Sequence, residues 1–147
     1  MTTLPQLTPV DDQFRCASKT EIQNIEKLLG SSLPKDYVEF LEHYGKSTFS
    51  GEATVTVEGN RSLGVFVLFA AGGEHCSVLA DLQAHENYLR EKVVPVGDDL
   101  FNNRYVLNPA SGEIFFVEYL HGTNSTVKVS SSFSDFINSI QVSADAL

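Results

Sequence analysis

The spacing of apolar residues changes at Gly45, and this change constrains the fold more than any other feature of the sequence. Before Gly45 the apolar residues recur every three or four positions, as on one face of an α-helix. After it they first alternate with polar residues, as in a β-strand with one buried face. A chain of 147 residues suffices for one domain with a core. We therefore expect an α+β domain in which helices cover an antiparallel sheet.

Two short helices are predicted before Gly45. Ser18 and Glu21 have the Ser-x-x-Glu spacing of a capping box, and Gly30 suits the left-handed conformation that ends a helix. The second helix has Pro34 near its start and ends at Gly45. Their predicted apolar faces consist of Ile22, Ile25, Leu28 and Leu29, and of Tyr37, Phe40, Leu41 and Tyr44. Isolated helices this short are marginal in water, so we expect the pair to pack as a hairpin on the rest of the domain.

The remaining sequence predicts six strands and two further helices. Alternating β-branched and aromatic residues indicate strands over residues 53–57, 63–69, 93–96, 104–108, 113–119 and 125–129. Helical spacing returns over residues 77–91 and 132–140. The predicted order is ααββαββββα, an antiparallel sheet of about six strands packed with four helices. Residues 18–141 would form the domain, after an extended or flexible arm (residues 1–17) and before a short tail (residues 142–147).

Two predicted strands, residues 63–69 and 113–119, are apolar on both faces. Such a strand lies at a sheet centre covered by helices on both sides, or it exposes an aromatic patch that binds a partner. We favour helix cover on both faces.

The charge of the chain restricts its partners. Nineteen acidic residues against ten basic ones give a formal net charge of −9. Proteins that bind nucleic acids or anionic membranes need clustered basic residues, whereas the ten basic residues of this chain are scattered singly. A basic protein partner would be attracted instead, although acidity also serves simply to keep a protein soluble. No apolar run is long enough to span a membrane and no signal-peptide pattern opens the chain, so we expect a cytoplasmic protein.

The sequence offers little to support catalysis or a bound metal. The four histidines stand in different predicted elements, and the pair His75–Cys76 has no further zinc ligands at a suitable spacing. Cys76 lacks the surroundings of a nucleophile, and Cys16 and Cys76 are expected to be reduced thiols. The adjacent aspartates Asp98 and Asp99 lie in a turn, where such residues usually accept backbone hydrogen bonds. We predict no catalytic residues, metal site or cofactor.

Several motifs resemble the SUKH superfamily (Smi/Knr type). The most specific is Leu33-Pro34-Lys35-Asp36-Tyr37, which follows Leu29-Gly30 and precedes Phe40-Leu41. The weaker matches are Val94-Pro95-Val96-Gly97-Asp98, Tyr105-Val106-Leu107-Asn108-Pro109, Glu113-Ile114-Phe115-Phe116-Val117-Glu118 and Ser132-Phe133 with Phe136-Ile137. Together they run from Ile22 to Ile140. The chain departs from the family pattern in the turn at residues 98–103, where the family has a glycine-rich turn.

The resemblance implies an intracellular, non-catalytic binding module. Bacterial members of the superfamily are typically immunity proteins that bind and block a cognate polymorphic toxin, often a nuclease. Nucleases are basic where they grip phosphates, so an acidic inhibitor would gain steering and complementarity. The alternative is a regulatory or scaffolding module without a toxin partner. The oligomeric state is left open.

We expect the partner to contact acidic residues, which we call the acidic rim. Its members are Asp98, Asp99, Glu113 and Glu118, with Glu39 and Glu42 of the second helix as outer acids. Rim charges of this kind set the rate and specificity of association more than the affinity.

Overall fold

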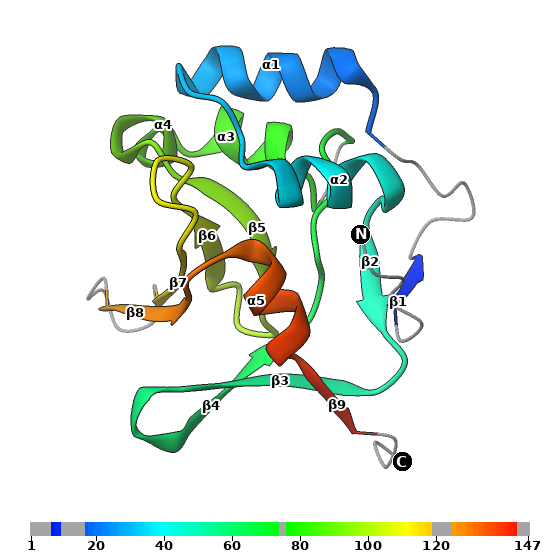
Figure 1. Ribbon diagram of the computed structural model, residues 1–147, viewed down its shortest axis with the longest axis vertical. Coiled ribbons are helices and arrows are strands. Elements are labelled where there is room, and N and C mark those ends of the chain that lie inside the picture. Colours follow the sequence, from blue (N-terminus) through cyan, green and yellow to red (C-terminus); the bar gives the residue numbers. More distant parts are fainter. Residues whose placement is uncertain (1–6, 10–16, 74–75, 119–124, 144–147) are drawn as a thin grey trace.

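The computed structural model describes residues 7–9, 17–73, 76–118 and 125–143 (Figure 1). Its α-helices are α1 (Lys19–Leu29), α2 (Lys35–His43), α3 (Val78–Ala84), α4 (Glu86–Glu91) and α5 (Phe133–Ser139), and η1 (Glu58–Asn60) is a 3₁₀ turn. Its strands are β1 (Leu7–Pro9), β2 (Ser47–Phe49), β3 (Glu52–Val57), β4 (Arg61–Val65), β5 (Val94–Asp98), β6 (Arg104–Leu107), β7 (Ile114–Glu118), β8 (Ser125–Ser130) and β9 (Gln141–Ser143). Helices and antiparallel strands are combined, which confirms the predicted α+β class.

The described strands are divided among sheets rather than joined in a single sheet of about six. Four strands pair in the order β5-β6-β7-β8, three in the order β4-β3-β9, and β1 pairs with β2. The predicted strand over residues 63–69 serves two sheets, because β4 ends at Val65 and the chain then crosses to β5. There Phe66 N–H donates to the Asp98 carbonyl (N···O 2.8 Å) and Phe69 N–H to the Val96 carbonyl (3.0 Å). Contact with both sheets explains why this run is apolar on both faces.

Three short strands lie outside the predicted ones. β1 falls within the predicted arm, of which residues 1–6 and 10–16 are outside the described ranges. β9 continues from the predicted domain into the predicted tail and pairs with β3. It crosses Gly51 so closely that a Cβ there would overlap the Ser143 carbonyl oxygen. Strands of three residues carry too little periodicity to be recognised in a sequence.

The predicted ends of α1 are confirmed. Glu21 N–H donates to Ser18 Oγ (3.2 Å) and Ser18 N–H to Glu21 Oε1 (3.1 Å), which is the reciprocal capping box. Gly30 takes a left-handed conformation with φ 68°, and its N–H donates to the Glu26 carbonyl (2.8 Å). The Glu26 carboxylate also accepts from Leu33 N–H (2.8 Å), so it holds the joint between α1 and α2.

The helix predicted over residues 77–91 is interrupted at His85. The residue has an extended backbone, with φ −134°, and it separates α3 from α4. Ser77 caps α3 by accepting a hydrogen bond from Ala80 N–H (3.1 Å). The His85 ring meets the Tyr88 ring edge-on with centroids 5.9 Å apart. Apolar spacing continues through the break, so periodicity alone does not reveal it.

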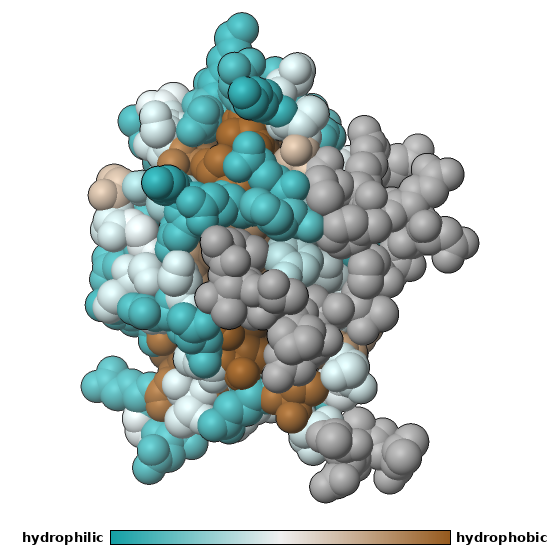
Figure 2. Space-filling view, turned by 45° about the vertical axis from the view of Figure 1, so that its right-hand side comes forward, coloured by the Kyte–Doolittle hydropathy of each residue, from teal (hydrophilic) through white to brown (hydrophobic). Residues whose placement is uncertain are grey.

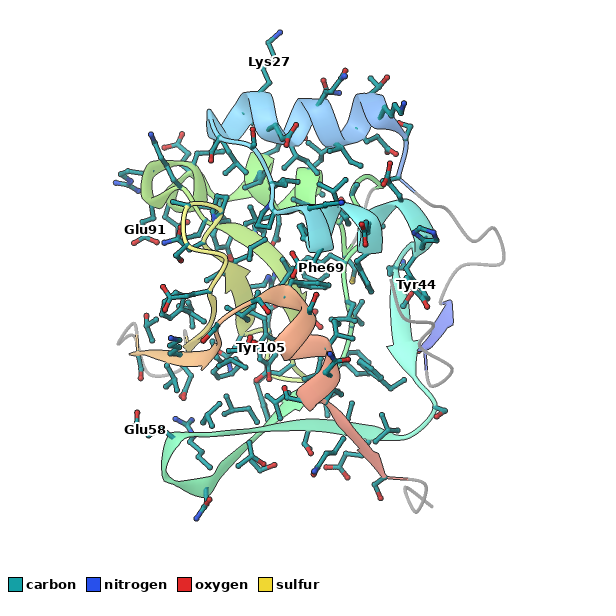
Figure 3. All side chains as sticks on the ribbon, viewed as in Figure 1. Lys27, Tyr44, Glu58, Phe69, Glu91 and Tyr105 are labelled. Carbon is teal, nitrogen blue, oxygen red and sulfur yellow. The ribbon has the colours of Figure 1, made fainter. Side chains whose placement is uncertain are left out.

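A chain of aromatic contacts joins the helices to the four-stranded sheet. The Phe133 ring of α5 lies 4.8 Å from Tyr37 and 5.0 Å from Phe40 of α2, measured between centroids. Tyr105 of β6 lies 5.2 Å from Phe136 of α5 and 4.9 Å from Phe116 of β7. Figure 3 shows Tyr105 and Phe69 inside the molecule, whereas Lys27, Glu58 and Glu91 point away from it.

The motif aspartate connects the same two helices. The Asp36 carboxylate of α2 accepts hydrogen bonds from Ser134 N–H (2.9 Å) and Ser134 Oγ–H (3.0 Å) at the start of α5. Ser132 caps α5 in turn, by accepting from Asp135 N–H (3.0 Å). An acidic side chain is also favourable at this end of a helix. The motif that carries the family resemblance therefore holds α2 against α5.

Helix cover is complete on only one face of β7. Ile114 and Phe116 are buried on the face that meets α5, whereas Phe115 and Val117 on the other face are only half-buried. A shallow pocket beside α4 lies next to these two residues. None of the described helices combines the length and apolar character that crossing a membrane requires.

Candidate functional site

Two acids predicted for the acidic rim, Asp98 and Asp99, support the turn between β5 and β6. The half-buried Asp98 carboxylate accepts a hydrogen bond from Val67 N–H (3.0 Å). Buried Asp99 accepts from Phe101 N–H and Asn103 N–H through Oδ1 (2.9 Å each), and from the Asn103 side-chain amide through Oδ2 (3.0 Å). The Asp99 bonds are of the local kind that aspartates in turns usually accept, whereas the Asp98 bond connects the turn to a distant segment. Both residues hold the backbone in place.

Burial is the main influence on the Asp98 carboxyl. It raises the pKa of Asp98 from its ordinary value of 3.8 to about 6, although the hydrogen bond from Val67 and the charge of Arg104 act in the opposite direction. The folded protein therefore holds a proton at this site more tightly than the unfolded chain. The stability that follows is present below pH 3.8 and is lost as the pH rises through about 6.

Replacing Asp98 by asparagine tests this pH dependence. The side-chain oxygen of the introduced asparagine can still accept from Val67 N–H, but the amide carries no charge to desolvate. We expect Asp98→Asn to melt at a higher temperature than the wild type well above pH 6, and the difference to shrink as the pH falls toward 3.8. Thermal denaturation across this range measures the gap, and a gap that does not change with pH would contradict the assignment.

The other four acids of the rim do not converge: Glu113 precedes β7, Glu118 ends it, and Glu39 and Glu42 lie on α2. Glu113 forms a salt bridge with Lys128 of β8 (Oε2···Nζ 2.9 Å), and this hydrogen bond lowers the pKa of Glu113. Glu118 pairs with Arg61 of β4. On α2, Glu42 is exposed and Glu39 is half-buried. The structure therefore brings only Asp98 and Asp99 together, and it pairs Glu113 and Glu118 with basic side chains.

Buried Arg104, the first residue of β6, stabilises the same turn from its other end. Its Nε donates to Asp81 Oδ2 of α3 (2.8 Å), and its Nη1 donates to the backbone carbonyl (2.9 Å) and side-chain oxygen (2.7 Å) of Asn102. The guanidinium also lies 5.6 Å from the centre of the Phe69 ring. The turn is thus held from inside by Asp99 and from α3 through Arg104.

The tip of this rigid turn carries two exposed apolar side chains. Leu100 is 74% exposed and Phe101 is 70% exposed, and Phe66 is 46% exposed on the segment that the Asp98 backbone and side chain hold. Monomeric proteins rarely gather large apolar side chains at the surface unless they bind something. Figure 2 shows apolar atoms exposed in the upper and lower parts of an otherwise largely hydrophilic face.

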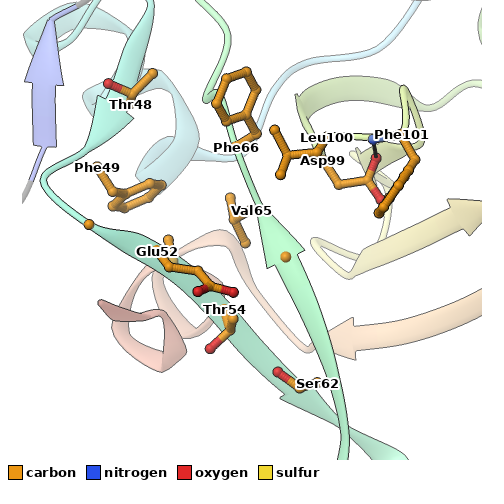
Figure 4. Close-up of a pocket in the computed structure, with 13 residues that line it drawn as sticks. Thr48, Phe49, Glu52, Thr54, Ser62, Val65, Phe66, Asp99, Leu100 and Phe101 are labelled. Carbon is orange, nitrogen blue, oxygen red and sulfur yellow. Dashed lines mark hydrogen bonds between the residues drawn. The ribbon is translucent and has the colours of Figure 1, made fainter. Parts of the chain in front are cut away.

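These side chains border a groove with a volume of about 700 Å³ (Figure 4). We call it the apolar groove, and its lining includes Phe49, Glu52, Thr54, Phe66, Leu100 and Phe101. In Figure 4 Phe49 lies on one side, Leu100 and Phe101 lie on the other, and Glu52 comes from β3 below them. None of the described residues that line the groove is Lys, Arg or His.

Sequence reasoning missed this groove. A local signal was present at Leu100-Phe101, two large apolar residues in a turn that otherwise consists of aspartates and asparagines over residues 98–103. Phe66 carried no such signal, because it belongs to an apolar run that is expected to be buried. Phe49 and Glu52 are separated from the turn by more than forty residues and approach it only through sheet packing.

The described residues contain no group of three or more His, Cys, Asp or Glu side chains able to hold a metal ion. Burial raises the pKa of the Cys76 thiol, and the nearby Asp98 charge acts in the same direction. The thiol is therefore protonated at neutral pH and is a weak nucleophile. Cys16, His75 and His121, also considered in the sequence, lie outside the described residues.

Comparison with known proteins identifies the family of the chain. No curated protein matches it. The SMI1 / KNR4 family (SUKH-1) matches over residues 16–139, a span that includes the four-stranded sheet, strands β3 and β4 of the three-stranded sheet, and the helices up to the end of α5. The domain of this family is generally a non-enzymatic immunity or binding domain. The chain belongs to the SMI1 / KNR4 family (SUKH-1).

Proposed function

We propose that this protein is an immunity protein that binds a cognate polymorphic toxin and neutralises it by covering its active surface. The family match over residues 16–139 carries the proposal, because it fits an immunity or other non-catalytic role. The toxin domain is expected to be basic, and a nuclease is the leading candidate.

Charge supports a basic partner. The net charge of −9 draws a cationic protein toward this one and accelerates the first encounter. We retain the acidic rim as the proposed contact region, with Asp98 and Asp99 acting through the turn they support. Glu113, Glu118, Glu39 and Glu42 would provide the outer charge. An interface of usual size would bury about 800 Å² of this protein.

The direct test of the function is protection of a cell. The protein is co-expressed with a basic toxin domain, sought first at the C-terminus of any large secreted protein encoded beside its own gene, and growth is measured together with complex formation. We expect survival and a stable stoichiometric complex. Cell death despite abundant folded protein would contradict the immunity function. A stable complex with a non-toxic partner would instead favour a regulatory or scaffolding module.

Charge reversal on the acidic rim tests how the partner is recruited. Combining Glu42→Lys with Glu113→Lys is expected to slow association with the basic toxin domain by roughly threefold to tenfold, because steering depends on these outer charges. The rate should also depend less steeply on salt. Stopped-flow mixing at several salt concentrations measures both effects.

A pair of matched variants controls for total charge. Glu58→Lys, on η1 and exposed, makes the same change of charge outside the acidic rim. Combined with Glu91→Lys, also at an exposed position, it should slow association less than the combination of Glu42→Lys and Glu113→Lys does. Equal slowing by both pairs would mean that only net charge matters and that the rim is misplaced.

A further inference from the structure

The apolar groove is preorganised by hydrogen bonds beneath it. Asp99 holds Phe101 and Asn103 by their backbone N–H groups, and Asp98 holds both Phe66 and Val67 by theirs. Phe66 and the Leu100-Phe101 tip are therefore fixed relative to one another through two adjacent aspartates. A surface that is already ordered loses little conformational entropy when it binds, which favours affinity.

The exposed side chains of the groove have the character of a binding hot spot. Leu100 and Phe101 remain largely in water, and Phe66 nearly half so, although all three lie at the edge of a cavity large enough for a short peptide segment. Covering large apolar side chains in such a pocket is the main source of affinity at protein interfaces. Leu28, another exposed large apolar residue (44%), is on α1 and does not line the groove.

The charges in the groove select the kind of segment that fits. Two carboxylates, Glu52 and Asp99, line it, and no basic side chain among the described residues does. Asp99 is buried and its oxygens already accept hydrogen bonds, whereas Glu52 is exposed. The carboxylate of Glu52 therefore offers a contact to a cation that arrives together with an apolar group. The overall charge of −9 acts in the same sense.

We infer that the apolar groove docks a protein segment in which a large apolar side chain stands close to a lysine or arginine. The apolar side chain packs against Phe66, Leu100 and Phe101, opposite Phe49, and the cation reaches Glu52 (Figure 4). The inference rests on the proposed function, since it names the surface by which this protein recognises its basic partner. In this arrangement apolar contacts form the centre of the interface, and the acidic rim attracts the partner as it approaches.

A selection of random linear peptides displayed on phage tests this inference without the toxin. The immobilised wild-type protein is expected to enrich peptides with a large apolar residue within a few positions of Lys or Arg. A synthetic peptide carrying the enriched motif, followed by fluorescence anisotropy, should bind Phe101→Ser and Phe66→Ser at least about tenfold more weakly. Glu52→Lys should change the preferred flanking residue from basic to acidic.

Leu28→Ser is the matched control, because it removes an apolar side chain of comparable exposure to Phe66 from a different surface. It should bind the peptide as the wild type does, and circular dichroism should show every variant folded. Absence of a shared motif, enrichment of acidic motifs, or equal binding by Phe101→Ser and the wild type would overturn the inference. Sedimentation could also show that the protein forms a dimer and that Phe101→Ser abolishes this dimer. That result would place a second copy of the chain in the groove and would overturn the inference.

The selection and the cell-protection test can fail separately. A toxin neutralised by the Phe66→Ser and Phe101→Ser variants as well as by the wild type leaves the immunity function standing and removes the groove from it. A groove that selects the expected peptides while no toxin is neutralised leaves a peptide-binding module and contradicts the immunity function.

Discussion

Replacing Phe40 by alanine is expected to lower the free energy of unfolding by about 3–5 kcal/mol. Phe40 is 1% exposed, stacks on Tyr44 with centroids 5.1 Å apart, and lies 5.0 Å from Phe133 of α5. Truncation removes contacts that join α2 to α5 and leaves a cavity that the aromatic rings around it cannot fill. Since domains of this kind have roughly 5–15 kcal/mol in total, the loss is severe. Urea denaturation followed by circular dichroism measures it.

Tyr37→Phe, one turn earlier on α2, is the control for this prediction. The Tyr37 hydroxyl is buried, and it has no hydrogen-bond partner among the described residues. Burial also raises the pKa of Tyr37. Removing the hydroxyl keeps the ring contact with Phe133 and should leave stability unchanged or increase it by about 1–2 kcal/mol. A Phe40→Ala variant that unfolds at the same urea concentration as the wild type would show that α2 does not form part of the core.

Replacing Arg104 by alanine is expected to cost about 3–5 kcal/mol, for an electrostatic reason. The Arg104 and Asp81 side chains are only 10% and 13% exposed, and they form a salt bridge of 2.8 Å between Nε and Oδ2. Without the guanidinium, Asp81 is left as a largely buried charge that has lost its salt-bridge partner, and the Asn102 oxygens lose the donors that Arg104 supplied. Denaturation curves give the loss of stability.

A double replacement separates charge from packing at this pair. Asp81→Leu combined with Arg104→Met removes both charges and keeps apolar volume, so it should be much closer to the wild type than Arg104→Ala is. If the double variant is as unstable as Arg104→Ala, the hydrogen bonds from Arg104 to Asn102 account for the cost. In that case the salt bridge contributes little.

Phe40→Ala and Arg104→Ala are expected to differ in their effect on the apolar groove. Arg104 holds the turn at Asn102, and Asp99 holds it at Phe101 and Asn103. Weakening the turn through Arg104→Ala should reduce peptide binding even though Arg104 does not line the groove. Phe40→Ala removes a ring where α2 packs on α5, not in the β5–β6 turn. It should therefore affect peptide binding only by lowering the stability of the whole domain.

Local features of the sequence predicted local features of the structure. The capping box at Ser18 and Glu21 and the helix end at Gly30 involve residues within a few positions of each other, so their hydrogen bonds are encoded where they form. The same holds for Asp99 of the β5–β6 turn, whose carboxylate accepts nearby backbone N–H groups, but not for Asp98, which accepts from distant Val67. The break at His85 was not predictable, because the apolar spacing that indicates a helix continues across it.

The acidic rim shows the limit of reasoning from residue type. Acidic residues are expected at the surface, but a sequence does not show which basic side chains lie across a strand pair. Glu113 meets Lys128 of β8 because β7 and β8 are neighbours, and Glu118 meets Arg61 from the other sheet. Asp98 and Asp99 turn inward to backbone donors. Under the proposed function, their contribution to partner binding is to position their neighbours.

By itself the sequence determined the α+β class, the order of the main elements, the ends of α1 and the family, because these depend on short-range spacing and hydrogen bonding. Only the tertiary structure decided that the apolar run after Arg61 leaves one sheet for another, and that Phe49, Phe66 and Phe101 border one groove. Such groupings arise when segments far apart in the chain pack together. The exposure of these side chains depends on how the whole domain buries its apolar surface, and no short stretch of sequence contains that information.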